Sequence, residues 1–275
     1  MVPRPQDGRV ASPVPPGRRR EFPWWLAAML ALGALLLWRI VADPVYRDIL
    51  AMLSQGIGVT VLVTLAAFAL ASALGIGLAV CVLSRSVVLR NAARFYIEVM
   101  RGLPILVLLL YIAFVAAPAL VAGWNAAARP LGLPELATRD LSLMARAILA
   151  LALAYAAFIA EVFRAGIQSV DRGQVEAAKA LGLGGWHRFR LIVLPQAVRT
   201  ILPPLGNDFV ALVKDSSLVS VLGVADITQL GKVYAAGSFR YFETYNVVAF
   251  LYLAMTLGLS LLLGALERRL RARSR

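Results

Sequence analysis

The chain has 275 residues, of which 60 % are hydrophobic and only 16 % are charged, whereas a soluble domain carries roughly 25 % charged residues. Together with a mean hydropathy of +0.77, these values exclude an ordinary water-soluble domain. The formal net charge of +13 would favour a nucleic-acid partner if the basic residues gathered on one polar face, but they are scattered between long apolar runs, so no nucleic acid is expected.

Six apolar segments are long enough to be membrane-spanning helices, because crossing roughly 30 Å of hydrocarbon takes about 20 mainly apolar residues. Tryptophans that suit the headgroup boundary flank the first segment, and the fifth is the least apolar. In chain order the segments are residues 24–42, 56–83, 96–121, 142–163, 191–213 and 245–266. The sequence therefore predicts an all-α polytopic membrane protein.

Lysine and arginine orient these spans, since loops left in the cytoplasm carry the excess of basic residues. With the N-terminus inside, the cytoplasmic segments hold 19 of the 28 basic residues and the opposite segments hold 6. The cytoplasmic segments are then residues 1–23, 84–101, 164–190 and 267–275. The opposite segments are residues 43–55, 122–141 and 214–244. This asymmetry predicts that both termini are cytoplasmic.

The two ends of the chain are expected to be tails. Residues 1–23 are rich in proline and arginine and have few apolar groups, which predicts a disordered cytoplasmic tail. Arg19, Arg20 and the two residues after them faintly resemble a twin-arginine export signal, but a basic anchor before the first span explains the same residues. Residues 269–275 predict a short basic cytoplasmic tail at the other end.

Two charged pairs lie where predicted spans meet the cytoplasm. Glu98 and Arg101 are three residues apart, and so are Glu161 and Arg164. This spacing places both partners on one helix face, where they can neutralise each other at the membrane edge. We expect structural ion pairs that anchor the helix ends.

The cytoplasmic segment 165–190 is too long for a tight turn and too short for a domain. It predicts a short helix that Ser169 or Asp171 caps and that Gly182 ends. A helix of about ten residues is not stable alone in water, so its apolar face must dock on something. From the residues alone, this can be the rest of the protein, the lipid surface or a soluble partner. The face consists of Val175, Ala178 and Leu181.

The fifth span contains Pro203 and Pro204, whose missing backbone donors predict irregular backbone at membrane depth. Such backbone is tolerated only against protein or a water-filled cavity, and an intramembrane carboxylate is a functional-site hypothesis by default. Either Asn207 and Asp208 face a translocation path and meet the substrate, or Asp208 lies near the outer water and pairs with Lys214 or an arginine. Weaker path candidates, beside an expected short helix at 218–230, are Ser216, Ser217 and Ser220.

Other classes of protein are weighed against these features. An ion-coupled secondary transporter would show inverted repeats and paired intramembrane charges, and it has no use for a long docking loop. A membrane-embedded enzyme is not indicated, because the single cysteine, Cys81, and the single histidine, His187, form no evident nucleophile–base pair. They also leave too few ligands for a zinc, haem or iron–sulfur site, so no metal is expected. The sequence has no G-x-x-x-x-G-K-[ST] loop, so another chain must supply any nucleotide energy.

The cytoplasmic segment resembles the EAA motif of binding-protein-dependent importer permeases. The matching residues are Glu176, Ala177, Ala178, Gly182, Ile192, Leu194 and Pro195. Further motifs similar to the polar amino-acid uptake branch of that family follow one another in the same order. They begin at Glu98, Ala160, Gly173, Asn207 and Lys214. The resemblance covers about residues 54–268, which is most of the chain.

This resemblance implies a membrane subunit of an ATP-binding-cassette importer of amino acids with the type I permease fold. Its five-span core would cover residues 54–268, and residues 24–42 would be an additional first helix. In this family the EAA loop is the coupling helix that docks into a cleft of the cytoplasmic ATPase. Carried over, the ATPase-coupling residues are Gln174, Glu176, Ala177, Ala178, Lys179, Leu181 and Gly182.

The resemblance also implies a set of partners in the bacterial cytoplasmic (inner) membrane. They are a second permease chain, identical or related, a cytoplasmic ABC ATPase dimer, and a periplasmic or lipid-anchored amino-acid-binding protein. ATP and magnesium would be bound by the ATPase. The chain itself would therefore be a transport subunit that binds no cofactor and is not an enzyme.

Overall fold

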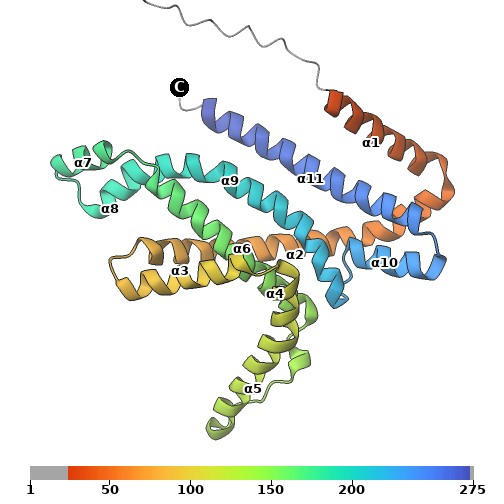
Figure 1. The fold of residues 1–275 in the computed structure, drawn as a ribbon, viewed down its shortest axis with the longest axis horizontal. Coiled ribbons are helices and arrows are strands. Elements are labelled where there is room, and N and C mark those ends of the chain that lie inside the picture. Colours follow the sequence, from red (N-terminus) through yellow and green to blue (C-terminus); the bar gives the residue numbers. More distant parts are fainter. Residues whose placement is uncertain (1–23, 273–275) are drawn as a thin grey trace, which may run out of the picture.

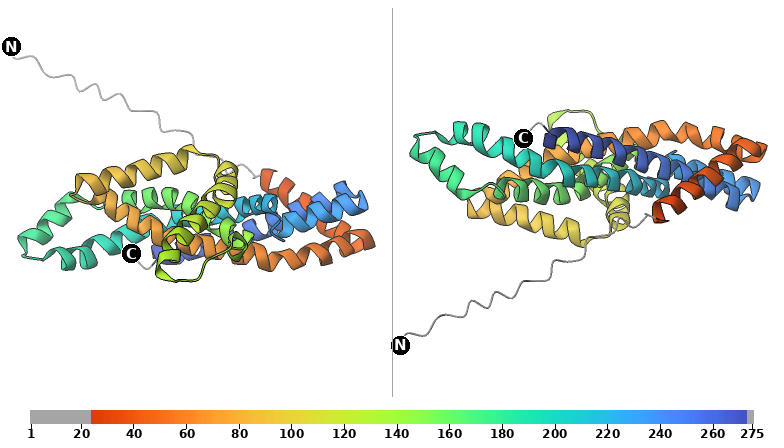
Figure 2. Two further views of the ribbon diagram at one scale, coloured as in Figure 1. Left: turned by 90° about the horizontal axis from the view of Figure 1, so that it is seen from below. Right: turned by 90° about the horizontal axis from the view of Figure 1, so that it is seen from above.

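The structure, a computed structural model, describes residues 24–272, and the regular structure in these residues is entirely helical (Figure 1). The body is elongated, with α7 and α8 at one end and the start of α2 with α10 at the other (Figure 2). The α-helices are α1 (Trp24–Ala42), α2 (Pro44–Leu83), α3 (Val87–Gly102), α4 (Ile105–Tyr111), α5 (Ala117–Ala128), α6 (Leu143–Gln168), α7 (Arg172–Ala180), α8 (Gly185–Arg188), α9 (Leu194–Asp215), α10 (Ile227–Ser238) and α11 (Tyr241–Ala272). Short π-helical segments are η1 (Ile112–Ala116) and η4 (Phe189–Val193), and short 3-10 segments are η2 (Arg129–Leu131), η3 (Thr138–Asp140) and η5 (Ser216–Leu222).

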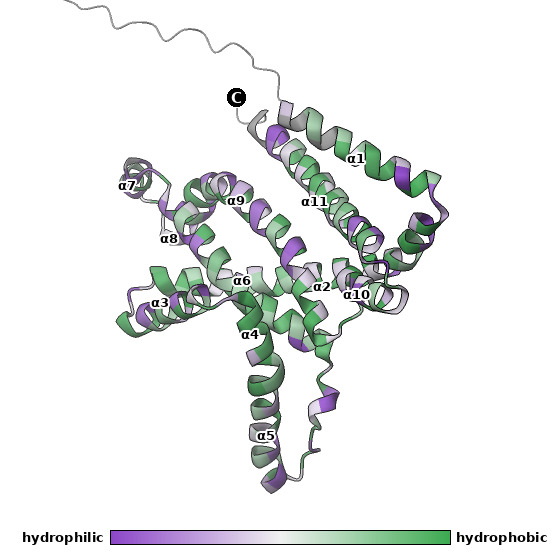
Figure 3. Cartoon of the chain, turned by 45° about the vertical axis from the view of Figure 1, so that its right-hand side comes forward, coloured by the Kyte–Doolittle hydropathy of each residue, from purple (hydrophilic) through white to green (hydrophobic). Residues whose placement is uncertain are grey.

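Within the described residues, four stretches of helix are long and apolar enough to cross a membrane. They are Pro44–Leu83, Ile105–Leu131, Leu143–Gln168 and Tyr241–Arg269. Hydrophobic residues cover most of α2 and α4, whereas hydrophilic residues recur in α3 and α9 (Figure 3). Helices α1 and α9 correspond in sequence to the first and fifth predicted spans, but they are not among these four stretches. Helix α9 carries the charged residues Arg199, Asp208 and Lys214. The all-helical, multi-span class is thus confirmed, and the count of six spans stays a prediction.

The second span begins earlier than predicted, and residues 43–55, expected to be a loop, are mostly helical. Asp43 caps α2, since its Oδ1 accepts a hydrogen bond from the Val45 N–H at 2.9 Å, and Pro44 supplies a φ suited to the first turn. With 40 residues, α2 is about 60 Å long, roughly twice the thickness of the hydrocarbon layer. One end of α2 must therefore extend past the bilayer.

Helices α2 and α6 pack closely at the centre of the molecule. A Cβ added to Gly75 would lie 2.8 Å from Cγ2 of Ile159, so only glycine allows this approach. Ala71 and Ala79, one turn before and after Gly75, are also buried. Small residues at four-residue spacing let two helices approach in the absence of a strong hydrophobic drive between them. The core cluster around this contact includes Val63, Leu109, Leu151, Ile159 and Leu212.

The third predicted span, residues 96–121, is wrong in its start and its continuity. Tyr96 belongs to α3, which ends at Gly102, and a new helix begins at Ile105. Pro104 explains the break, because proline disfavours helical backbone at the residue before it and has no N–H to continue the ladder. The segment 84–101, expected to be a cytoplasmic loop, is therefore mostly an antiparallel partner of α2.

Helix α9 is continuous through Pro203 and Pro204, so the interruption predicted there is wrong. An interior proline costs about 3 kcal/mol or more, and contacts on both sides of the pair offset this cost. Before the pair, Ile201 is buried, and after it the ring of Phe209 lies 4.7 Å from that of Phe68 in α2. The prediction of one short helix at 218–230 is also wrong. Gly223, whose backbone has a left-handed conformation, follows η5, and α10 begins only at Ile227.

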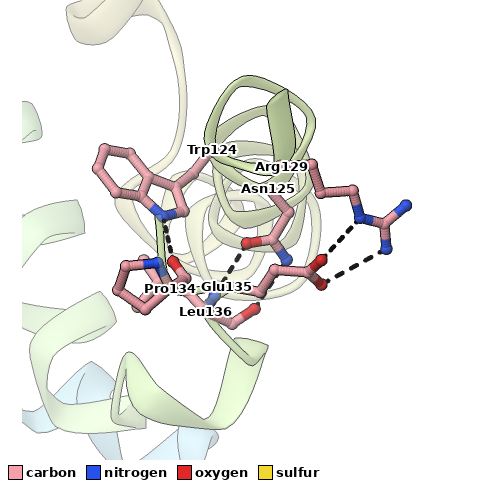
Figure 4. A network of polar contacts seen from close by, with 6 residues as sticks. All are labelled: Trp124, Asn125, Arg129, Pro134, Glu135 and Leu136. Carbon is pink, nitrogen blue, oxygen red and sulfur yellow. Dashed lines mark hydrogen bonds and ion pairs between the residues drawn. The ribbon is translucent and has the colours of Figure 1, made fainter. Parts of the chain in front are cut away.

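Helix α5 projects from the body and is held to the returning chain by a polar network (Figures 1 and 4). The Trp124 ring N–H donates to the Pro134 carbonyl at 3.2 Å, and the Asn125 carbonyl oxygen accepts from the Leu136 N–H at 2.8 Å. Arg129 pairs with Glu135 at 2.7 Å, and its hydrogen bond and charge lower the pKa of that carboxyl. The loop after α5 is therefore an ordered hairpin.

Arg146 fastens this hairpin to the core from inside. It is 7 % exposed and donates to three backbone carbonyls, those of Ala113, Leu141 and Thr138. A buried arginine is tolerated only when its donors are satisfied. These acceptors come from η1, η3 and the linker between η3 and α6, so a single side chain joins three segments.

Residues 1–23 and 273–275 lie outside the described residues. The predicted disordered tail, the residues that resemble a twin-arginine signal and the last three residues of the predicted basic tail therefore fall there. Residues 269–272 of that tail belong to the last turn of α11.

Candidate functional site

The helix predicted in the cytoplasmic segment is present as α7, Arg172–Ala180. Of the two predicted caps, Asp171 is used, and its Oδ1 accepts a hydrogen bond from the Gln174 N–H at 3.2 Å. Gly182 follows the helix with φ +76°, a left-handed conformation that side chains rarely adopt. A cap and a stop encoded in the sequence thus delimit the helix on both sides.

One side of α7 packs on its own protein. Ala178 is 3 % exposed, and Val175 lies against a cluster that includes Val170, Ala197 and Ile201. The predicted apolar face is divided, however, because Leu181 is 81 % exposed. Only Val175 and Ala178 of that face point inward.

The same end of the molecule joins α6, α7 and α9 into one unit. The side-chain amide of Gln196 in α9 donates to the side-chain oxygen of Gln174 in α7 at 2.6 Å. A Cβ at Gly166 of α6 would overlap with the Ile201 side chain of α9. Helices α6 and α9 are thus in close contact at this end of the molecule, and one side-chain hydrogen bond joins α7 to α9.

The other side of α7 is open. Glu176, Ala177 and Lys179 are exposed, and Gln174 is exposed around its bond to Gln196. Trp186 of α8, which the sequence reading did not select, is 66 % exposed and its ring lies 6.0 Å from that of Phe189. The sequence feature that could have identified Trp186 is its place directly after two glycines, Gly184 and Gly185. The exposed residues of α7 and of the segment after it thus include two charged side chains, Glu176 and Lys179, and two large apolar ones, Leu181 and Trp186.

Of the two predicted ion pairs, the structure contains one. Arg164 Nη2 lies 2.6 Å from Glu161 Oε2, and Arg164 also donates to Gln168. The pair between Glu98 and Arg101 is wrong: the Arg101 guanidinium lies over the ring of Phe158 in α6 instead, 5.6 Å from its centroid. Tertiary packing therefore overrides the three-residue spacing at this position.

Asp208 is half-buried, and its Oδ2 atom is fully buried without a hydrogen-bond partner among the described residues. No ion pair joins it to Lys214 or to an arginine of residues 24–272. Asn207, beside it, is exposed. Two turns further along α9, Asp215 accepts a hydrogen bond from the Tyr155 hydroxyl of α6 at 2.7 Å. The structure therefore contains an unpaired carboxylate oxygen next to an exposed amide on α9.

The serine candidates differ from one another. The Ser216 hydroxyl is buried and donates to the Val213 carbonyl at 2.7 Å, so it stabilises the end of α9. Ser220 is buried, and its carbonyl accepts from Lys232. Ser217 is only half-buried. Ser217 alone among them has an accessible side chain, while Ser216 and Ser220 are structural.

Sequence comparison relates the chain to transport proteins. Residues 71–273 match the family described as binding-protein-dependent transport system inner membrane component. The chain is 36 % identical to the probable amino-acid permease protein YxeN of Bacillus subtilis over 78 % of this chain and 90 % of that protein. It is 38 % identical to the glutamine transport system permease protein GlnP of Escherichia coli over 66 % of this chain and 75 % of that protein.

Solved structures agree with these sequence matches. A crystal structure of an amino acid ABC transporter with histidines has a TM-score of 0.67 and 36 % identity, covering 80 % of this chain and 94 % of that one. The MetNI methionine ABC transporter in an inward-facing form has a TM-score of 0.58 at 19 % identity, covering 83 % and 98 %, and shows the shared fold. The chain therefore belongs to the family of binding-protein-dependent transport system inner membrane components, and it is a multi-pass permease subunit of the inner membrane.

Proposed function

We propose that the chain is the membrane-spanning subunit of an ATP-driven amino-acid importer, and that α7 is the helix through which a separate ATPase drives it. One observation carries the coupling role. Helix α7 is joined to α6 and α9 through Val175, which packs on their shared apolar cluster, and through the Gln174–Gln196 hydrogen bond, while Glu176 and Lys179 are exposed and free to meet a partner. The relatives named as amino-acid, glutamine and arginine permeases support the substrate class.

The proposed assembly has four kinds of component. Two permease chains, identical or related, enclose the path, an ATPase dimer lies beneath them, and an amino-acid-binding protein docks outside. ATP and magnesium are bound by the ATPase, and this chain is a transport subunit without catalysis of its own. Nucleotide and loaded binding protein shift the permease between inward and outward forms by their differential affinity for the two.

We propose six spans with both termini in the cytoplasm. Helix α1 is then an additional first span beside the five-span core at 54–268, and α7 lies on the cytoplasmic side with residues 164–190. The grouping of α7 and α8 at one end of the body and of α10 at the other supports this arrangement (Figure 2).

The substrate path is proposed to pass Asn207 and Asp208. A carboxylate at membrane depth is stable only beside protein donors, water or a bound cation. Among residues 24–272, Asp208 has no hydrogen-bond donor at its buried Oδ2, and the residue is partly exposed beside the exposed Asn207, so the ammonium group of an amino acid is a fitting partner for this carboxylate. Ser217, in η5 directly after α9, is the serine candidate that remains partly accessible.

A reconstituted complex tests the proposal. Purified permease with its ATPase in proteoliposomes should hydrolyse ATP faster when a loaded binding protein is added outside, and should accumulate the amino acid. Uptake driven by an ion gradient without ATP would support the secondary transporter instead. The same assay across a panel of amino acids identifies the substrate.

A further inference from the structure

The exposed side of helix α3 carries two different stripes of residues. Arg94, Glu98 and Arg101 form a charged stripe, and Val88, Phe95 and Val99 form an apolar stripe. All six residues are exposed, Phe95 by 73 % and Val88 by 77 %. At 3.6 residues per turn, the two stripes are separated by about a third of a turn. The two stripes therefore face different surroundings at the same depth.

The packing of α3 places its second half beside a helix that is long and apolar enough to cross a membrane. Ile97 lies in a buried cluster with Ala157 and Ala160 of α6, and the Tyr96 hydroxyl donates to the Leu153 carbonyl at 2.8 Å. Leu153 lies near the middle of the span Leu143–Gln168. Glu98 and Arg101 are thus beside the inner half of a spanning helix, not beyond its end.

Charged side chains at this depth do not face lipid; they face the interior of a bundle or a water-filled cavity. No ion pair joins Arg94, Glu98 or Arg101 to another of residues 24–272, and Arg101 instead lies over the ring of Phe158. The apolar stripe has the opposite preference and suits acyl chains. A single helix at this depth therefore separates a lipid side from a polar side.

The charged stripe continues toward the carboxylates of α9. Arg101 lies over Phe158, and the Phe158 ring lies 6.0 Å from that of Tyr155. The Tyr155 hydroxyl in turn bonds to Asp215, on the same helix as Asp208. A run of contacts between charged and aromatic groups thus connects α3, α6 and α9.

We propose that Arg94, Glu98 and Arg101 line the water-filled path on its cytoplasmic side, and that Val88, Phe95 and Val99 face lipid. This inference rests on the proposed import function and adds the exit route to it. Two guanidinium groups with a carboxylate between them suit a zwitterion, whose carboxylate and ammonium meet opposite charges at successive positions. Asp208 and the charged stripe are then successive parts of one route.

Cysteine accessibility tests the inference with matched pairs. The background is the full chain carrying Cys81→Ala, assembled with its ATPase in inside-out membrane vesicles, because Cys81 is the only cysteine. Glu98→Cys is compared with Val99→Cys, and Arg94→Cys with Phe95→Cys, using a water-soluble methanethiosulfonate reagent. Neighbouring residues share one depth, so only the direction that each faces differs.

We expect labelling at positions 94 and 98 to be at least about tenfold faster than at 95 and 99, because the reactive thiolate forms only where water solvates it. Equal rates in both pairs would place α3 outside the bilayer and overturn the inference. Slow labelling at 94 and 98 would show a dry protein contact and also overturn it. Since a lost charge can impair folding, Asn91→Cys and Ala92→Cys repeat the comparison without removing a charge.

Uptake in the same vesicles separates this inference from the proposed function. ATP-dependent transport with uniform labelling would contradict the path assignment alone. The expected labelling pattern without ATP-dependent transport by the Cys81→Ala protein would contradict the import function alone.

Discussion

Gln174 in α7 accepts a hydrogen bond of 2.6 Å from the side-chain amide of Gln196 in α9. The same Gln196 amide group also donates to the Ile192 carbonyl in the π-helical turn before α9. This pair joins the proposed coupling helix to the helix that carries Asp208. One side-chain hydrogen bond and one continuous helix thereby connect the proposed ATPase contact to the proposed substrate path.

The first prediction concerns this bond. Gln174→Ala and Gln196→Ala should each lower the amount of amino acid imported per ATP hydrolysed. Each removes the hydrogen bond between α7 and α9, whose net contribution to stability is about 1 kcal/mol. The measurement is uptake divided by ATP hydrolysis in proteoliposomes. The double variant should lose little more than either single variant, since both remove the same bond. Additive losses would contradict a shared role.

The second prediction concerns the open side of α7 and α8. Trp186→Ala should weaken binding of the ATPase by about 2 kcal/mol, because buried tryptophans dominate interface energies. Glu176→Arg should uncouple transport through like-charge repulsion with a basic partner group. Copurification at increasing salt and uptake measure the two effects. Leu131→Ala, which also truncates a highly exposed side chain but lies in η2, is the control and should change neither.

The third prediction concerns the close approach of α6 and α9. Gly166→Ala should destabilise the chain by about 1–3 kcal/mol, because the new Cβ overlaps with Ile201. Adding Ile201→Ala should restore part of this loss by making room. The thermal transition of the detergent-solubilised protein reports both effects. Gly77→Ala in α2, where nothing lies within 4 Å of an added Cβ, should be close to neutral.

The fourth prediction concerns the unpaired carboxylate. Asp208→Ala should abolish or strongly reduce uptake, while assembly with the ATPase persists, because Asp208 Oδ2 bonds to no described residue. Uptake and copurification are measured side by side. Asp48→Ala, which removes an exposed carboxylate near the start of α2, should leave uptake unchanged. Normal uptake and unchanged substrate preference in the Asp208 variant would reject its place in the path.

The fifth prediction concerns Arg146. Arg146→Met should loosen the hairpin after α5, since three backbone carbonyls then lose a hydrogen-bond donor. The bond to Ala113 is buried and those to Leu141 and Thr138 are partly buried, and a buried acceptor left unpaired costs about 1–3 kcal/mol. Faster tryptic cleavage at the exposed Arg139 reports this loosening. Arg129→Gln breaks only the exposed pair with Glu135 and should have a much smaller effect. Equal cleavage rates in both variants would contradict the clamp.

Local signals predicted the helix of the cytoplasmic segment well. A capping acid at 171, strong helix formers and a glycine at 182 describe α7 completely, because a short helix needs only a start, a body and a stop. Side-chain packing then divided the expected apolar face. Ala178 turned inward and Leu181 outward, since α9 approaches α7 from one side only.

Local signals failed where neighbours decided the outcome. Pro203 and Pro204 predicted a break, yet contacts at Ile201 and Phe209 keep α9 helical. Glu98 and Arg101 have the spacing of an ion pair, yet the Arg101 guanidinium packs on the ring of Phe158 instead. Both errors have one cause: the local sequence does not show which distant helix packs against a given residue.

The sequence by itself determined the all-helical membrane class, the presence of helix α7 and the family, because each depends on composition, periodicity or a contiguous motif. Only the tertiary structure decided which side of α7 is open, where Asp208 is left unpaired, and that α3 has a charged stripe distinct from its apolar one. These properties belong to pairs of helices far apart in the chain, and a contact between two helices exists only after both have packed.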